Sequence, residues 1–167
     1  MLLIKIREIG ATPWLMKREL PQILKRVWEE IGNHWHRQMR PKHFTHAGAR
    51  EYGYTPRKGE KDAASSKGFR RSYSGRKLRK FGHTLPLVYT GESRDITARR
   101  DVRPTRHGVR IVMAANKLNY KNPYTAIDKR DEMTRVSPEE TRTLAAMFNR
   151  WLNQSLRAMK VSREISI

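Results

Sequence analysis

The side chains with the clearest potential for chemistry are four histidines in two close pairs. His34 and His36 flank a tryptophan, and His43 and His46 are three residues apart. Residues two apart on a helix point to different faces, and the chain has no cysteine that could complete a thiolate zinc site. The sequence therefore predicts no metal site, and it places these histidines on a solvated basic surface.

Carboxylates are scarce, and their clearest group is Asp128, Asp131 and Glu132, within five residues. A metal-dependent nuclease needs two or three acids that converge on Mg²⁺. Neighbouring acids in a loop do not specify such convergence, so a nuclease is only the third hypothesis for function. Glu139 and Glu140 are explained by a favourable position at a helix N-terminus.

Other catalytic and cofactor motifs are missing. The serines at 65–66 and 72–74 lack the spacing of a nucleophile elbow, and no glycine-rich nucleotide-binding motif occurs. The sequence therefore predicts a protein that is not an enzyme, with no catalytic residue and no cofactor.

Positive charge is the strongest chemical feature. The 167 residues include 36 Lys and Arg against 16 Asp and Glu, a net charge of +20. Such a charge opposes compaction unless counterions or a polyanion screen it. The stretch at about 45–84 has eleven Lys and Arg against three Asp and Glu, with one Leu and no Ile, Val or Trp. Because so little apolar content cannot offset its ordering entropy, we predict a long basic loop or arm that is ordered only against a partner.

This basic arm is the candidate contact site for nucleic acid or for an assembly partner. Lysines and arginines can neutralise phosphates, and aromatic rings can stack on bases. The basic residues assigned to the site are Arg57, Lys58, Lys61, Arg70, Arg71, Arg76, Lys77, Arg79 and Lys80. The interleaved aromatic residues are Tyr52, Tyr54, Phe69, Tyr73 and Phe81. An acidic protein surface is the alternative partner.

Two long amphipathic helices are predicted, one on each side of the arm. The first begins at Pro13 or Pro21, has apolar residues at steps of three and four, and ends by Pro41. The second begins where Ser137 and Glu140 form a capping box, and ends near residue 160. Three tryptophans on the apolar stripes are expected in the core: Trp28, Trp35 and Trp151.

Strands are predicted at 2–9 and in a hairpin formed by 94–103 and 109–114. A polar loop is expected at 116–124 and a short tail at 161–167. The predicted fold is a single α+β domain over 1–167, in which a small antiparallel sheet packs against the two long helices. No stretch has the roughly 20 apolar residues of a membrane helix, and the N-terminus lacks a signal-peptide pattern. The absence of cysteine fits a reducing cytoplasm.

A short motif follows the apolar run 85–89, with Thr90 and Gly91, then Arg94, then Ile96. This motif and the order of elements resemble the tail-completion and head–tail joining (neck) proteins of long-tailed bacteriophages, including the virion-morphogenesis type. In that family a similar stretch leads into the sheet. The chain departs from the family after the hairpin, where Tyr124 is not followed by the usual Gly-Thr, and in the strong charge of the arm.

The resemblance implies a structural component of a virion, made in the host bacterial cytoplasm, that forms a ring at the head–tail junction around or near the DNA channel. Its implied partners are copies of itself, other neck, connector or tail-tube proteins, and double-stranded DNA, with no membrane. Completion, terminator and connector roles all remain open. The alternative function is a basic nucleic-acid-binding protein without catalysis.

Overall fold

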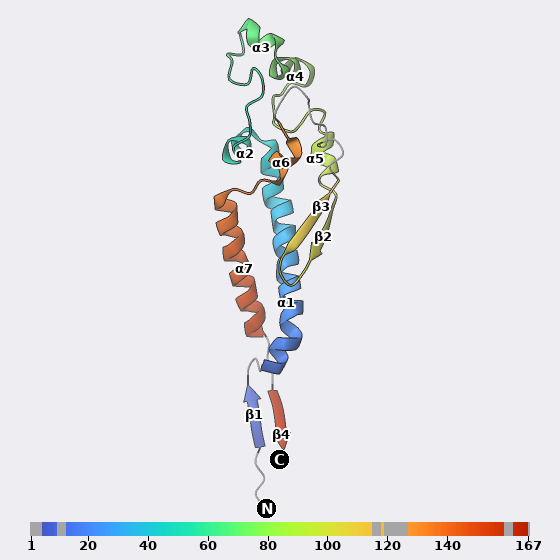
Figure 1. Ribbon diagram of the computed structural model, residues 1–167, viewed down its shortest axis with the longest axis vertical. Helices are drawn as coiled ribbons and strands as arrows, with labels where there is room; N and C mark the ends of the chain where they lie inside the picture. Colours follow the sequence, from blue (N-terminus) through green and yellow to red (C-terminus); the bar gives the residue numbers. More distant parts are fainter. Residues whose placement is uncertain (1–4, 10–12, 115–117, 119–126, 159–161, 167) are drawn as a thin grey trace, which may run out of the picture. The chain divides into compact units, whose positions relative to one another are not determined.

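The chain combines helices with two small sheets, as the computed structural model in Figure 1 shows. The structure describes residues 5–9, 13–114, 118, 127–158 and 162–166. In chain order the elements are β1 (Lys5–Ile9), α1 (Pro13–His34), α2 (His46–Glu51), α3 (Lys67–Arg71), α4 (Tyr73–Phe81), α5 (Glu92–Ile96), β2 (Arg100–Pro104), β3 (Val109–Met113), α6 (Lys129–Thr134), α7 (Pro138–Ala158) and β4 (Ser162–Ser166). Strands pair as β1–β4 and β2–β3, in two separate sheets. The predicted α+β class is confirmed.

The chain's internal contacts divide it into two compact units. Unit 1 comprises Met1–Asn33, Val102–Ile111 and Arg142–Ile167, and unit 2 comprises His34–Asp101 and Val112–Thr141. The sequence predicted one domain. In the structure, nearly all of both long helices belongs to unit 1, whereas the basic stretch 45–84 belongs to unit 2.

The two long helices form where the apolar periodicity predicted them. Helix α1 begins at Pro13, and Pro21 lies inside it. Ile23, Val27 and Ile31 on its apolar stripe are buried. The ring centroids of Trp28 and of Phe148 on α7 are 4.5 Å apart. The apolar side chains of α7 are only half-buried. Unit 1 thus covers the stripe of α1 well and that of α7 in part.

The predicted capping box at the start of α7 is present. The Ser137 hydroxyl accepts a hydrogen bond from the Glu140 backbone N–H at 3.1 Å. The Glu140 carboxylate in turn accepts from the Ser137 backbone N–H at 3.3 Å. Each bond satisfies a backbone donor that the first helical turn would leave unpaired. The predicted end near residue 160 lies outside the described residues.

The predicted hairpin is formed by β2 and β3, and the Thr105 N–H donates to the Gly108 carbonyl at 2.8 Å across its turn. Its first strand is shorter than expected, because residues 92–96 form helix α5. Val102 and Val109 of the hairpin approach Gly32 of α1 so closely that a Cβ there would lie 3.0 and 2.8 Å from their methyl groups. This close approach explains a glycine inside a long helix.

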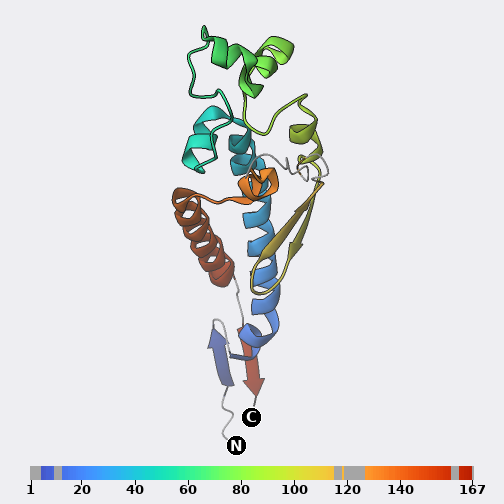
Figure 2. The same cartoon turned by 45° about the horizontal axis from the view of Figure 1, so that its top comes forward.

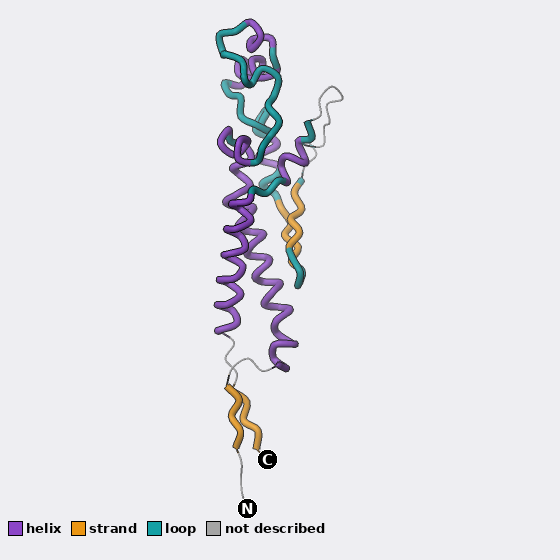
Figure 3. The backbone as a smooth tube through the Cα atoms, turned by 60° about the vertical axis from the view of Figure 1, so that its left-hand side comes forward, coloured by secondary structure: helices purple, strands orange, loops and turns teal. Residues whose placement is uncertain are grey.

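The C-terminal segment is not a tail. Strand β4 pairs antiparallel with β1, as the two adjacent strands in Figure 3 show. The register sets Ile6 opposite Ile165, Arg7 opposite Glu164 and Glu8 opposite Arg163. The prediction missed β4 because a five-residue strand without a turn signal resembles an irregular end.

The basic stretch 45–84 was wrongly predicted as a loop or arm, because it contains helices α2, α3 and α4. Short polar caps start all three: Thr45, Ser66 and Ser72 accept hydrogen bonds from backbone N–H groups three residues ahead, at 3.0, 3.0 and 3.1 Å. Such caps satisfy donors that a short helix would leave open. Figure 2 shows α3 and α4 in green, and Ser72 is the residue that separates them in the chain.

Unit 2 has its own core, formed largely by aromatic and aliphatic side chains next to the basic stretch. The core residues are Phe44, Ala49, Tyr52, Tyr54, Leu87, Val88, Leu118 and Met133. The basic stretch has no Ile or Val. Its tyrosines are buried instead, together with apolar residues from outside it such as Leu87 and Val88. The predicted polar loop at 116–124 lies almost entirely outside the described residues.

Candidate functional site

A groove of about 960 Å³ lies in unit 2, and the segments 53–57 and 84–90 both contribute to its lining. Five cationic side chains contribute to its lining: Arg50, Arg57, Lys61, Lys77 and Lys129. Only two carboxylates do so, Glu60 and Glu92. The groove is therefore positively charged, and two exposed tyrosines, Tyr73 and Tyr89, also line it.

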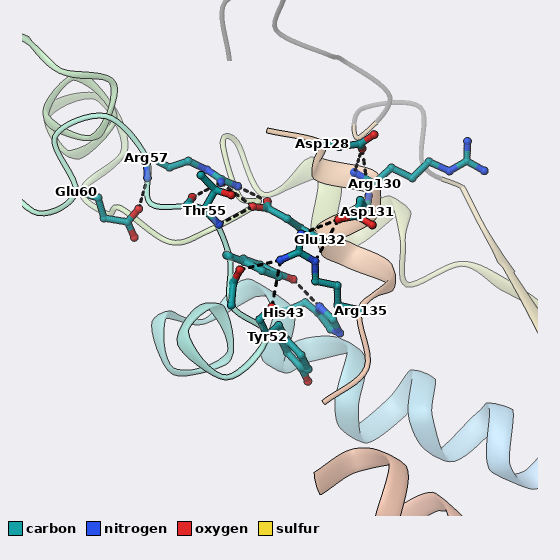
Figure 4. Close-up of polar contacts among 12 residues, drawn as sticks. His43, Tyr52, Thr55, Arg57, Glu60, Asp128, Arg130, Asp131, Glu132 and Arg135 are labelled. Carbon is teal, nitrogen blue, oxygen red and sulfur yellow. Dashed lines mark hydrogen bonds and ion pairs between the residues drawn. The ribbon is translucent and has the colours of Figure 1, made fainter. Parts of the chain in front are cut away.

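Arg57 is held in place by a buried carboxylate, as Figure 4 shows. Its guanidinium makes two hydrogen bonds to Glu132, at 2.8 and 2.5 Å. The Thr55 backbone N–H donates to the same carboxylate at 3.2 Å. Burial disfavours the charged guanidinium, but the hydrogen bond and charge of Glu132 outweigh it, so the pKa of Arg57 is raised. This pairing fixes the position of one cation of the groove.

Glu132 and Asp131 lie on helix α6, and Asp128 is the N-cap of this helix. Asp128 caps the helix by accepting from the backbone N–H groups of Arg130 and Asp131, at 2.9 and 3.1 Å. Asp131 pairs with Arg135 at 2.7 Å. The three acids of the nuclease hypothesis thus have three separate structural partners. Among the described residues, no three His, Asp or Glu side chains lie close enough together to hold a metal ion.

Arg135 ties α6 to the turn beside the groove. Its guanidinium donates to the Gly53 carbonyl at 2.7 Å and to the Tyr52 carbonyl at 3.3 Å, while also binding Asp131. Gly53 has a left-handed backbone conformation (φ 61°), which glycine adopts at little cost. Two contacts from one side chain therefore hold the segment that leads from α2 into the groove, and the contact with Asp131 anchors that side chain on α6.

Two lysines of the groove carry their charge at a cost. Lys77 is buried and donates from Nζ to the Leu85 carbonyl. Its pKa is lowered to about 8, first by burial and next by the charge of Arg57. Burial and the charge of Arg57 also lower the pKa of Lys129. The three cations Arg57, Lys77 and Lys129 therefore repel one another along this groove. Of the three, Arg57 is the one that Glu132 holds.

The histidine prediction was wrong for two of the four residues, because His36 and His43 are buried rather than solvated. His36 Nε2 lies 2.9 Å from the Thr97 carbonyl. The His43 ring stacks on Tyr52 with centroids 3.9 Å apart and interplanar angle 1°, and its Nδ1 lies 2.5 Å from the Tyr54 hydroxyl. Both rings are core elements, placed by the helical turns over Trp35–Met39 and Arg40–Phe44.

His43 should make unit 2 less stable in mild acid. Its pKa is lowered to about 4, mainly by burial, which outweighs a backbone contact with Glu132 and the charge of Glu51, while Arg40 and Lys42 lower it further. In the unfolded state His43 has the ordinary histidine pKa of about 6.5 and binds a proton below that pH. The free energy of unfolding therefore decreases as the pH falls from 6.5 towards 4. Linkage predicts a loss of about 2 kcal/mol between pH 7 and pH 5.

Urea unfolding at pH 7 and pH 5 measures this loss. His43→Phe keeps a ring beside Tyr52 but cannot titrate, so its loss between the two pH values should be smaller by about the same 2 kcal/mol. His46→Gln is the control, because His46 is exposed. An equal pH dependence in wild type and His43→Phe would contradict the prediction.

The structure divides the nine basic residues predicted for the site into two groups. Arg57, Lys61 and Lys77 line the groove. The other six are exposed and do not line it: Lys58, Arg70, Arg71, Arg76, Arg79 and Lys80. Sequence reasoning missed Arg50 and Lys129 at the groove. Arg50 lay within the basic stretch, but Lys129 is separated from it by more than forty residues and gave no signal.

The aromatic residues predicted to stack on bases fall into a buried group and an accessible group. Tyr52, Tyr54 and Phe69 are buried in unit 2 and cannot offer a ring face to a base. Tyr73 is 36% exposed, and Phe81 is half-buried. Tyr89, which the prediction did not include, is 47% exposed, and its ring centroid lies 4.7 Å from that of Phe81 and 6.3 Å from that of Tyr73.

The family-like motif lies in unit 2, in the chain between the core residues 87–88 and strand β2. Leu87 and Val88 enter the core just before it. Gly91 then takes a left-handed conformation (φ 92°) at the start of α5. The Arg94 carbonyl accepts from the buried Arg40 guanidinium at 3.0 Å, while the Arg94 side chain is exposed beside Asp95. Thr90 is exposed at the groove, and Ile96 is half-buried. The motif thus consists of a glycine turn that leads directly into the short helix α5.

Comparison with protein-family models, with curated proteins and with solved structures finds no match to this chain. In the part of the chain that the structure describes, no helix has the length and apolar character needed to span a membrane.

Proposed function

We propose that this chain is a structural, non-enzymatic component of a phage-like particle, at the head–tail neck or the top of the tail. In this proposal, copies of the chain form a ring around or near the DNA channel and contact other neck, connector or tail-tube proteins. Completion, terminator and connector roles fit the proposal equally.

The half-covered apolar stripe of α7 carries the proposal. Six of its apolar side chains are only half-buried in the chain: Leu144, Met147, Phe148, Trp151, Leu152 and Leu156. A partner that packed on α7 would complete the burial of this stripe, and apolar surface left accessible on a helix can mark an interaction site. A ring subunit needs two different surfaces that are complementary to each other for its head-to-tail contacts, and an incompletely covered helix can supply one of them.

The resemblance of the motif at 90–96 to neck proteins supports the kind of assembly. The motif, with its glycine turn and the short helix α5, precedes the hairpin in the chain, as a similar stretch precedes the sheet in those proteins. The net charge of +20 fits the same setting, because copies of such a chain repel one another unless a polyanion such as DNA screens them.

Quantitative mass spectrometry of density-gradient-purified particles tests this proposal. A known amount of isotopically labelled, separately purified chain is added to the lysate before purification, and the particles are washed in high salt. We expect unlabelled chain at a small, fixed ratio to the capsid and tail-tube proteins, with the labelled chain depleted. Equal recovery of both forms means adventitious binding of a basic protein. That result, or absence of the chain from particles, would contradict the neck role and favour the nucleic-acid-binding alternative.

A further inference from the structure

We propose that the groove of unit 2 is a binding site for the phosphate backbone of a nucleic acid. Arg50 and Lys61 at its exposed edges would contact phosphates, and Arg57, Lys77 and Lys129 would supply positive potential inside it. This inference does not rest on the neck role, because it concerns a site within one chain.

The charges that line the groove are the first argument. Five cations and two carboxylates line one concave surface. The guanidinium of one of these cations, Arg57, is paired with the buried Glu132. Concave surfaces with charge of one sign focus the electrostatic field and attract ions of the other sign. The ligand should therefore be an anion with several charges in a row.

The repulsion among the inner cations is the second argument. Lys77 and Lys129 both have lowered pKa values, first from burial and next from the charge of Arg57. An anion in the groove would favour the charged forms of both lysines and relieve the repulsion. The cluster thus favours the bound state over the empty one.

The tyrosines at the groove favour a nucleic acid over an acidic protein segment. Tyr73 and Tyr89 are exposed, and Phe81 packs against Tyr89. Aromatic rings next to cations are the arrangement that binds nucleic-acid strands, in which phosphates meet the cations and bases stack on the rings. A second copy of this chain is a poor occupant, because each copy carries a net charge of +20.

The test compares two charge-matched double variants. Arg50→Glu with Lys61→Glu reverses two exposed cations of the groove, and Lys67→Glu with Arg71→Glu reverses two exposed cations of unit 2 that do not line it. Both variants change the net charge by the same amount, so general electrostatic attraction affects them equally. Thermal unfolding confirms that both remain folded.

Fluorescence anisotropy with a labelled 20-nucleotide strand, and with its duplex, measures affinity from low to physiological salt. We expect the groove variant to lose at least tenfold more affinity than the control variant. The slope of log affinity against log salt should also become shallower, because two phosphate contacts are lost. The expected change is roughly 1.4 for a single strand or 1.8 for a duplex. Equal losses in the two variants would overturn the proposal, as would tighter binding of a poly-glutamate peptide than of either nucleic acid.

Tyr89→Ala distinguishes the two forms of nucleic acid. If the groove holds an unpaired strand, this substitution should weaken single-strand binding by about tenfold, since stacking contributes about 1–3 kcal/mol per base. If it holds a duplex through phosphates alone, duplex binding should be unchanged by Tyr89→Ala and still reduced in the groove variant. Both patterns support a phosphate site and identify its ligand.

Discussion

Replacing Glu132 with alanine should lower the free energy of unfolding of unit 2 by about 3–5 kcal/mol, the usual cost of removing one partner of a buried ion pair. The Glu132 side chain is 2% exposed, and it binds the Arg57 guanidinium twice and the Thr55 N–H once. Without it, Arg57 keeps its charge beside Lys77 and Lys129 and has lost the carboxylate that held it. The destabilisation therefore combines an unpaired buried cation with stronger repulsion in the groove.

Urea unfolding followed by tyrosine and tryptophan fluorescence measures this loss, and Asp131→Ala is its control. Asp131 lies on the same helix and also binds an arginine, but its side chain is 60% exposed. Exposed ion pairs contribute about 0–1 kcal/mol, so the control should change little. If the two alanine variants lose equal stability, the buried pair does not organise unit 2. Glu132→Gln should fall between them, because it keeps hydrogen-bonding atoms but not the charge.

Gly75→Ala should have the second largest effect, about 3 kcal/mol or more, at the upper end of overpacking costs. A Cβ at Gly75 would lie 2.0 Å from the Phe69 carbonyl oxygen and 2.8 Å from its carbon. These are backbone atoms of α3, so the clash cannot be relieved by a rotamer change. Helices α3 and α4 would have to separate, which would break the Ser72 cap of α4 and expose Phe69.

Gly68→Ala is the matched control, because Gly68 lies in α3, where a new Cβ would meet nothing closer than 3.4 Å. Alanine is the better helix former by about 1 kcal/mol, so this variant should be as stable as the wild type or more so. The difference in melting temperature between the two variants reports whether α3 and α4 pack as described. Two variants of equal stability would mean that the stretch 45–84 is the loop that its composition predicted.

The long helices could be predicted because their signals are redundant. α1 and α7 each combine several turns of apolar periodicity with a proline or a capping box at the start, so loss of one signal would not change the prediction. The short helices of unit 2 have too few residues for periodicity to show. Their signals are single capping residues, Thr45, Ser66 and Ser72, which composition alone does not reveal.

The groove could be predicted only in part. Arg57, Lys61 and Lys77 were identified from local charge, but charge alone did not separate them from exposed neighbours such as Arg70 and Lys80. The carboxylate that holds Arg57 lies 75 residues away in sequence. Partners so far apart come together only through the tertiary fold, so no local pattern in the chain indicates them.

The pairing of β1 with β4 has a consequence for the order in which the chain can fold during synthesis. Strand β1 is synthesised well before its partner β4, since Lys5 pairs with Ser166. Unit 1 also takes its residues from three separate stretches, whereas unit 2 is complete by Thr141. Domains generally fold as units during synthesis, N-terminal parts first. Here the middle of the chain can fold first, and β1 must wait until β4 has been made, as an unpaired edge that nascent-chain partners could occupy.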